Sequence, residues 1–142
     1  MPTDLLAVAR ERAQTNLFWR YLDVQVDEAG DGWVKLRVPV RDPLRNGVGA
    51  PVHGGVLSAL VDMAVGGALS TTNENAAGGV GQTTLDLNVS FLAAASDGEI
   101  RAEGRLLRRG RSIAFGEARI TDGAGKLVAV GRATYMLLSP KS

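Results

Sequence analysis

One carboxylate stands out in the sequence because its surroundings are almost entirely apolar. Asp62 is the only ionisable residue between Gly54 and Asn73, a stretch without proline. Burying an unpaired carboxylate is costly, so such a residue either finds a partner or faces a cavity. Two interpretations stay open at this point. Asp62 is either a structural residue bonded to a neighbouring strand, or a general base or nucleophile held in a dry site.

The only histidine, His53, directly precedes two glycines where this apolar stretch begins. Backbone N–H groups in the first turn of a helix lack intrahelical partners, so they favour an anion or a polarised carbonyl. Gly54 and Gly55 have no side chains, which lets a ligand approach these amides closely. The lipase-like oxyanion loop also contains H-G-G, but it requires a G-x-S-x-G pentapeptide that this sequence lacks. We therefore do not expect a Ser–His–Asp triad.

Two further segments contain residues typical of phosphate binding. Residues 78–84 (GGVGQTT) lack the lysine of a phosphate-binding loop and follow a predicted helix, so they are interpreted as a helix-to-strand connection. Arg108, Arg109 and Arg111 cluster near the end of a predicted strand. They either form a solvated rim or bind phosphate groups through fork-like hydrogen bonds.

Composition excludes several classes of protein. The chain has 142 residues, as expected of one domain, and its net charge of +1 with only 5% aromatic residues argues against nucleic-acid binding. The absence of cysteine and the single histidine argue against a metal site. No signal-peptide pattern is found, and no apolar stretch reaches the ~20 residues that span a bilayer. We expect a cytoplasmic protein without a membrane partner.

Hydrophobic periodicity predicts the elements that position these residues. Residues 4–15 have the spacing of a short amphipathic helix, and residues 54–72 predict a helix that is apolar on nearly every side and therefore enclosed. Alternating segments predict a hairpin strand and its turn within 22–32, and strands over 33–40, 85–91, 99–109, 112–121 and 127–138. Short turns favour an antiparallel sheet curved around the apolar helix, which is an α+β fold.

The segment that contains the histidine and the aspartate has a characteristic spacing. Residues 53–64 (HGGVLSALVDMA) resemble the H-G-G-x(6)-D-x-A signature of hotdog-fold thioesterases of the phenylacetate-degradation (PaaI-like) type. The resemblance covers roughly residues 17–138. It includes Asn46, Gly49, the strand over 85–91, and Gly110-Arg111-Ser112.

The resemblance implies both a fold and an activity. The implied fold is a hotdog fold, in which a curved antiparallel sheet wraps around one long central helix. A single domain would span residues 1–142, with an N-terminal helix over 1–16 and the central helix over 54–72. The implied activity is that of an acyl-CoA thioesterase, which hydrolyses the thioester to a free acid and coenzyme A. It implies no metal and no cofactor, because coenzyme A enters as part of the substrate.

The resemblance also implies a role for each matching residue. Asp62 is implied to act as general base toward water or as nucleophile, and the Gly55 N–H to polarise the thioester carbonyl. Thr84 is implied to help hold the water, while Asn46 and His53 line the thioester end of the site. Implied contacts with the substrate and its coenzyme A come from Val52, Gly54, Phe91, Arg109, Gly110, Arg111 and Ser112.

Helix geometry adds an expectation about assembly. Gly55 and Asp62 are seven residues apart, so in one helix they are separated by about 10.5 Å along the axis, and a single carbonyl can hardly meet both from one chain. A composite site, with Gly55 from one subunit and Asp62 from its neighbour, removes this difficulty, and the resemblance implies the same. We expect a dimer, with pairing of dimers into a tetramer.

Two other functions stay open beside the thioesterase. A hotdog hydratase or dehydratase acting on acyl-CoA or acyl carrier protein would pair a catalytic histidine with a carboxylate. A non-catalytic acyl-CoA-binding protein would be expected to lack the acid. The lone His53 before two glycines, with Asp62 nine residues further on, fits the thioesterase better than the hydratase. Asp62 within an apolar helix argues against the binding protein.

Overall fold

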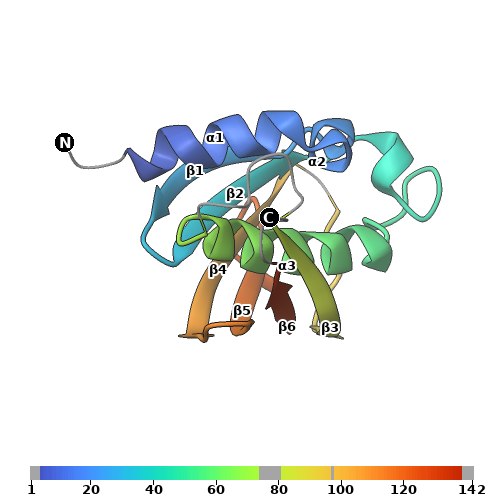
Figure 1. Ribbon diagram of the computed structural model, residues 1–142. Helices are drawn as coiled ribbons and strands as arrows, with labels where there is room; N and C mark the ends of the chain where they lie inside the picture. The colour runs from blue at the N-terminus through green and yellow to red at the C-terminus, as the bar shows by residue number, and fades with distance from the viewer. Residues whose placement is uncertain (1–3, 74–80, 97, 139–142) are drawn as a thin grey trace.

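A six-stranded antiparallel sheet curves around one long helix (Figure 1). Two further helices lie beside the sheet. The structure, a computed structural model, describes residues 4–73, 81–96 and 98–138. The strands lie in the order β1-β2-β4-β5-β6-β3, which confirms the predicted α+β class. The elements are α1 (Leu5–Thr15), α2 (Leu17–Leu22), β1 (Gln25–Gly30), β2 (Trp33–Pro39), η1 (Asp42–Leu44), α3 (Gly54–Ser70), β3 (Gln82–Phe91), β4 (Glu99–Arg109), β5 (Ile113–Asp122) and β6 (Leu127–Leu137).

Helix α3 packs against the concave face of the sheet, mainly on β4, β5 and β6. The alternating apolar residues of β2 and β4 point toward it and are buried. On β4, a Cβ added to Gly104 would lie 2.3 Å from the Ala64 carbonyl oxygen, so only glycine allows the helix to approach this closely. The prediction of an enclosed apolar helix is confirmed. None of the helices in the described part of the chain is long and apolar enough to cross a membrane.

The C-terminal end of α3 lies two residues earlier than predicted. The helix ends at Ser70. The hydroxyl of Thr71 donates to the Ala68 carbonyl at 2.7 Å, and that of Thr72 donates to the Leu69 carbonyl at 2.8 Å. Threonine side chains thus bind carbonyls that would otherwise lack a partner at the helix end.

Helix α2 was not predicted, and the start of the following strand was predicted too early. Asn16 Oδ1 accepts the N–H groups of Phe18 and Trp19, at 3.1 and 3.2 Å, and so caps the N-terminus of α2. Asp23 ends the helix in the left-handed conformation, with φ of 59°. The alternation that begins at Leu22 therefore belongs to a helix end, and β1 begins only at Gln25.

Strand β3 begins earlier than the alternation indicated. Residues 82–84, predicted as part of a connection, already pair with β6 in the register Gln82↔Leu137. The Gln82 side chain also donates to the Gly66 carbonyl of α3 at 2.8 Å, which holds this end of the strand against the helix. The preceding residues 78–80 of the predicted connection lie outside the described residues.

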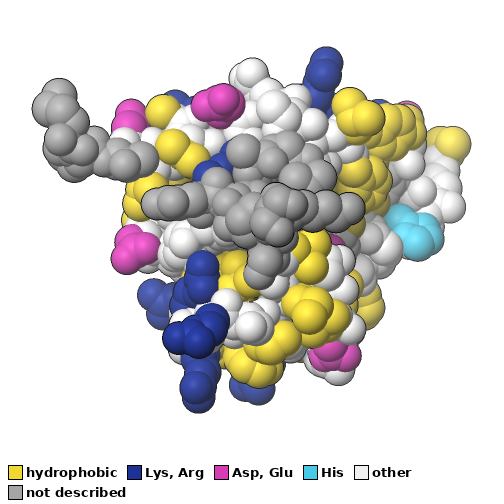
Figure 2. All heavy atoms as spheres, in the orientation of Figure 1, with side chains coloured by type: hydrophobic (Ala, Val, Ile, Leu, Met, Phe, Trp, Pro, Cys, Tyr) yellow, Lys and Arg dark blue, Asp and Glu magenta, His cyan; other side chains and the backbone are white. Residues whose placement is uncertain are grey.

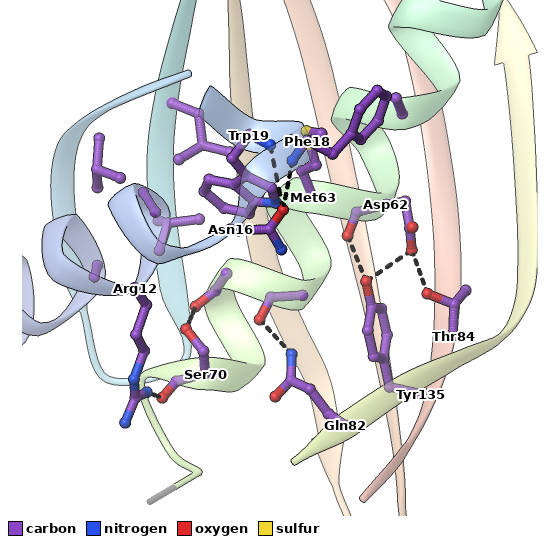
Figure 3. A pocket seen from close by; sticks show the side chains of 18 of the residues that line it. Arg12, Asn16, Phe18, Trp19, Asp62, Met63, Ser70, Gln82, Thr84 and Tyr135 are labelled. Carbon is purple, nitrogen blue, oxygen red and sulfur yellow. Dashed lines mark hydrogen bonds between the residues drawn. The ribbon is translucent and has the colours of Figure 1, made fainter. Parts of the chain in front are cut away.

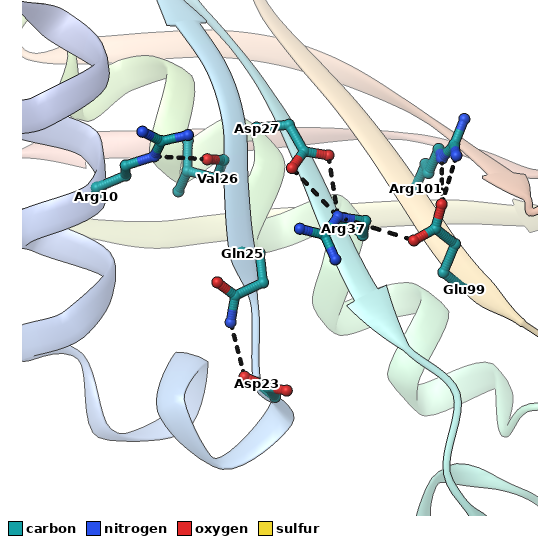
Figure 4. Close-up of polar contacts among 8 residues, drawn as sticks. All are labelled: Arg10, Asp23, Gln25, Val26, Asp27, Arg37, Glu99 and Arg101. Carbon is teal, nitrogen blue, oxygen red and sulfur yellow. Dashed lines mark hydrogen bonds and ion pairs between the residues drawn. The ribbon is translucent and has the colours of Figure 1, made fainter.

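Charged side chains link β1, β2 and β4 on the outer face of the sheet (Figure 4). Arg37 Nε lies 3.2 Å from Asp27 Oδ1 and 3.8 Å from Glu99 Oε2, and Arg101 also pairs with Glu99. These groups are partly exposed, so each pair contributes at most about 1 kcal/mol to stability. They add polar cross-strand contacts on the sheet face opposite α3.

Strand β3, at one edge of the sheet, carries apolar side chains that the described part of the chain leaves open to solvent. Leu85, Leu87 and Phe91 are 54%, 38% and 54% exposed. Apolar side chains gather on the β3 side in Figure 2, whereas Lys and Arg gather toward β4 and β5. Among the strands that the structure describes, only β6 pairs with β3, so the other backbone edge of β3 has no partner strand there. Exposed apolar edge strands of this kind are typical of interaction surfaces.

Candidate active site

Two hydroxyl groups hold one carboxylate oxygen of Asp62 (Figure 3). Thr84 Oγ1 on β3 donates to Asp62 Oδ1 at 2.8 Å, and the Tyr135 hydroxyl on β6 lies 2.7 Å from the same oxygen. The Tyr135 hydroxyl is also 2.8 Å from the Asp62 backbone carbonyl. Asp62 is half-buried, and among the described residues no donor reaches its second oxygen, Oδ2. Oδ2 is therefore available to accept a proton or to attack an electrophile.

Tyr135 is a functional residue that the sequence analysis missed. Its side chain is 7% exposed, and burial together with the negative charge of Asp62 raises the pKa of its hydroxyl. The group therefore stays protonated and donates. A Cβ added at Gly66 would lie 2.5 Å from the hydroxyl oxygen, so this glycine leaves room for it. The sequence contained one signal for Tyr135: it is a tyrosine on a strand otherwise rich in buried residues. The hydroxyl of a buried tyrosine needs a hydrogen-bond partner.

A cavity of about 330 Å³ lies beside Asp62, between the two N-terminal helices and α3. Trp19 and Met63 contribute much of its apolar wall, and Asp62 contributes a polar group. This volume is at the lower end of the range for small-molecule sites. The other lining residues are Ala9, Arg12, Ala13, Asn16, Phe18, Val26, Val34, Leu36, Ala59, Gly66, Gly67, Ser70, Gln82, Thr83, Thr84 and Tyr135.

The Gly55 N–H, which was expected to polarise a thioester carbonyl, is instead hydrogen-bonded to the side chain of His53. His53 caps α3, and its Nδ1 accepts the Gly55 N–H at 2.7 Å. A ligand carbonyl must therefore displace the imidazole to reach this amide, and the exposure of His53 leaves the ring room to move. Phe91 lies next to this helix start, since a Cβ added at Gly54 would be 3.3 Å from the Phe91 ring.

The loop before α3 places Asn46 and Val52 close to each other in the backbone. The Asn46 N–H donates to the Pro51 carbonyl at 3.0 Å, and Arg45 forms an isolated antiparallel bridge with Val52. Val52 is buried and its N–H donates to the Ala95 carbonyl at 2.7 Å, whereas Asn46 is exposed. In a single chain, Val52 thus anchors the loop and Asn46 is open to solvent.

The arginine cluster lies at a third location. Arg109 Nη1 donates to the Gly110 carbonyl at 2.8 Å, and its Nε donates to Thr72 Oγ1 at 3.2 Å, beyond the end of α3. Arg111 and Ser112 are exposed. Within one chain, Asp62 and Thr84 therefore lie together at the cavity. The start of α3 and the arginine cluster do not line this cavity. In the described part of the chain, no group of three or more His, Cys, Asp or Glu side chains could hold a metal.

Comparison with known proteins decides the family. Residues 51–129 match the thioesterase superfamily. This chain belongs to the thioesterase superfamily. It is 36% identical over 124 residues to a candidate esterase of Halobacterium salinarum, a match that covers 81% of this chain and 80% of the relative. The matched span contains residues 53–64, so the family predicted from that segment is confirmed.

Solved structures agree with this membership in the thioesterase superfamily. Zebrafish thioesterase superfamily member 2 is 33% identical, with a TM-score of 0.76 over 94% of this chain and 95% of that one. The E. coli PaaI protein of the phenylacetic acid degradation operon has a TM-score of 0.82 over 97% and 99% of the two chains. At 18% identity, PaaI shows the shared fold alone. The hotdog fold is thereby confirmed.

Proposed function

We propose that this protein is an acyl-CoA thioesterase, in which water cleaves the thioester into a carboxylic acid and coenzyme A. The observation that carries the proposal is the Asp62 carboxylate, which has Oδ1 held by two hydroxyls and Oδ2 available beside a cavity. Membership in the thioesterase superfamily supports hydrolysis of a thioester. Asp62 is thus interpreted as a reacting group rather than as a purely structural one.

In the proposed reaction, Asp62 Oδ2 takes a proton from water as the water oxygen bonds to the thioester carbonyl carbon. As nucleophile, Oδ2 would instead bond to that carbon, and water would then open the resulting anhydride. In both routes the carbon–sulfur bond breaks and coenzyme A leaves as a thiolate that takes up a proton. The Gly55 N–H, once His53 moves away, stabilises the negative carbonyl oxygen at the helix start.

The proposed site combines two chains. Gly55 and Asp62 are seven residues apart on α3, about 10.5 Å along the helix axis, so one carbonyl reaches both only if they come from different copies. The exposed apolar side chains of β3 and its unpaired edge support antiparallel pairing of two β3 strands. This pairing places Thr84 and Asp62 of each copy close to the partner. Pairing of two such dimers would give the tetramer.

Loss of the Tyr135 hydroxyl is expected to slow the reaction without weakening substrate binding. In Tyr135→Phe, only Thr84 still holds Asp62 Oδ1, and we expect kcat to fall about tenfold with KM nearly unchanged. Tyr21→Phe, on exposed α2, is the matched control. An unchanged kcat, or a rise in KM as large as the fall in kcat, would contradict this positioning role.

The arginine cluster is expected to bind the phosphates of coenzyme A. Arg111→Ala should raise KM about tenfold and leave kcat nearly unchanged, because a hydrogen bond to a charged group contributes about 1.5 kcal/mol. Arg109→Ala should act similarly, although Arg109 also contacts Thr72. Added salt should weaken binding more in the parent than in the variants. If KM equals that of the parent and of the control Arg119→Ala, these arginines form only a solvated rim.

The experiment that tests the proposed function is release of free thiol from a panel of acyl-CoAs of different size and polarity. We expect turnover of some members by the parent and almost none by Asp62→Asn. Absence of thiol release across the panel, with the substrates shown to bind, would favour an acyl-CoA-binding protein.

A further inference from the structure

One face of α3 carries both Asp62 and a wall of the cavity beside it. The residues of α3 that line the cavity recur every three or four positions, so they form a single stripe along the helix. They are Ala59, Asp62, Met63, Gly66, Gly67 and Ser70. Apart from Asp62 and Met63 they are alanine, glycine or serine, so little side-chain volume fills the space beside this stripe. The carboxylate and the cavity therefore belong to the same face of α3 in one chain.

The opposite wall of the cavity, on α1, also consists of small residues. Ala9 and Ala13 are about one helical turn apart, and both are buried and line the cavity. Helix α1 packs mainly on β1 and α2 rather than on α3. The Arg10 side chain contributes to this placement, since its Nε donates to the Val26 carbonyl of β1 at 3.0 Å. Small residues on both helices thus keep the cavity between α1 and α3 open.

Trp19 of α2 forms an aromatic wall of this cavity. Its ring atom Cη2 would lie 3.2 Å from a Cβ added at Gly67, so the indole packs directly over α3 (Figure 3). The Trp19 backbone is held as well, because its N–H donates to Asn16 Oδ1 at 3.2 Å and its carbonyl accepts the Val24 N–H at 3.0 Å. An aromatic wall fixed at Gly67 limits how far an apolar group can extend from Asp62 along α3.

The cavity of about 330 Å³ has room for an apolar acyl group. Buried Val34 and Leu36 of β2 add apolar surface to its lining. A 150 Å³ apolar cavity binds benzene, which corresponds to ~25 Å³ for each carbon atom. Leucine has three more carbon atoms than alanine, so a leucine on the α1 wall would fill about 75 Å³ of this space.

We infer that the acyl group of the substrate binds in the cavity of the same chain that supplies Asp62, where Ala9 and Trp19 set its size. The inference rests on the proposed function, because the position of the thioester carbonyl is taken from Asp62. The alternative place for the acyl group is the apolar surface exposed on β3, which includes Leu87. Binding there predicts that changes on α1 and α2 leave the acyl preference unchanged.

The first test is a series of straight-chain acyl-CoAs from butyryl-CoA to dodecanoyl-CoA. Ala9→Leu should lower kcat/KM at least tenfold for the longest thioesters that the parent hydrolyses, because each methylene that no longer fits costs about fourfold. The kcat/KM for butyryl-CoA should stay within about twofold of the parent value. Ala7→Leu places the same leucine at an exposed position of α1 and is the matched control. An unchanged series in Ala9→Leu would overturn the inference.

Trp19→Leu tests the opposite direction, since it removes part of the aromatic wall. It should raise kcat/KM for dodecanoyl-CoA relative to butyryl-CoA about tenfold. Trp33→Leu, at a tryptophan of β2 that does not line the cavity, should leave this ratio unchanged. The parent ratio in folded Trp19→Leu would contradict the role of Trp19. Ala9→Leu adds apolar contact in open space and should not lower the melting temperature, so it carries the comparison if Trp19→Leu loses folded protein.

Hybrid dimers show which chain binds the acyl group. Gly55→Pro lacks the amide N–H and Asp62→Asn lacks the base, so the complete site of their hybrid uses Asp62 from the Gly55→Pro chain. Ala9→Leu in the Gly55→Pro chain should therefore shift the acyl series, whereas in the Asp62→Asn chain it should have no effect. The reverse result would place the acyl group in the partner and overturn the inference. Inactive hybrids would refute only the composite site, and the parent series would then decide.

Stabilisation by the thioesters separates failure of this inference from failure of the proposed function. The rise in melting temperature of the parent should grow with acyl length, and Ala9→Leu should limit that growth. If no thiol is released but this pattern is seen, the inference stands and the proposed function falls. If thiol is released and the acyl series of Ala9→Leu equals that of the parent, the inference is wrong and the thioesterase stands. If neither effect is found, both are wrong.

Discussion

Asp62→Asn is expected to lower kcat by about 10²–10⁴, the usual effect of losing a general base. Asparagine has the same size and its Oδ1 still accepts from Thr84 and Tyr135, but its amide nitrogen cannot take a proton from water. Binding of a non-hydrolysable acyl-CoA analogue should survive. Since the variant also removes a half-buried charge, its melting temperature should equal that of the parent or exceed it.

A structural role for Asp62 predicts the opposite pattern, with a lower melting temperature and unchanged turnover per folded molecule. Measurement of kcat and melting temperature on the same preparation separates the two roles. Asp31→Asn, an exposed carboxylate in the turn between β1 and β2, is the matched control and should match the parent in both. A kcat of Asp62→Asn close to that of the parent would remove Asp62 from the mechanism.

Mixing two inactive variants is expected to restore activity, because the proposed site combines two chains. Gly55→Pro removes the N–H that stabilises the carbonyl oxygen, and proline is tolerated in the first turn of a helix. A hybrid dimer of Gly55→Pro and Asp62→Asn chains contains one site in which both groups are intact. Equal co-expression should therefore give about a quarter of the parent activity per chain, because half of the dimers are hybrids.

A site contained within one chain predicts no recovery, since every chain in the mixture lacks one of the two groups. Each variant alone should be nearly inactive yet folded, as its melting temperature would show. Sedimentation of the parent at micromolar concentration should give a dimer or a tetramer. A fully active monomer, or hybrids without activity, would refute the composite site.

The fold could be predicted largely from hydrophobic patterning. The uninterrupted apolar helix over 54–72 and the alternating segments define elements that can bury their apolar surface in only a few arrangements. Helix α2 was missed because six residues are too few to show a helical period, and its boundaries depend on Asn16 and Asp23. The early start of β3 was missed because it depends on pairing with β6, which is distant in sequence.

The candidate site could be predicted only in part. Asp62 was found because a lone carboxylate in an apolar helix is unusual, and Thr84 followed from the resemblance. Tyr135 is 73 residues from Asp62, and no local pattern shows that β6 passes this face of α3. The hydrogen bond from the Gly55 N–H to His53 was also missed, because the sequence gives no indication of the rotamer that makes the imidazole a helix cap.

One measurement tests thioester hydrolysis most directly: incubation of the parent with trans-2-hexenoyl-CoA in oxygen-18 water, followed by mass spectrometry of all products. We expect equal amounts of free coenzyme A and 2-hexenoic acid, with the heavy oxygen in the acid and almost none of this product from Asp62→Asn. Water added across the double bond of an intact thioester would instead show a hydratase, and unchanged thioester would show a binding protein. Either result would contradict hydrolysis at Asp62.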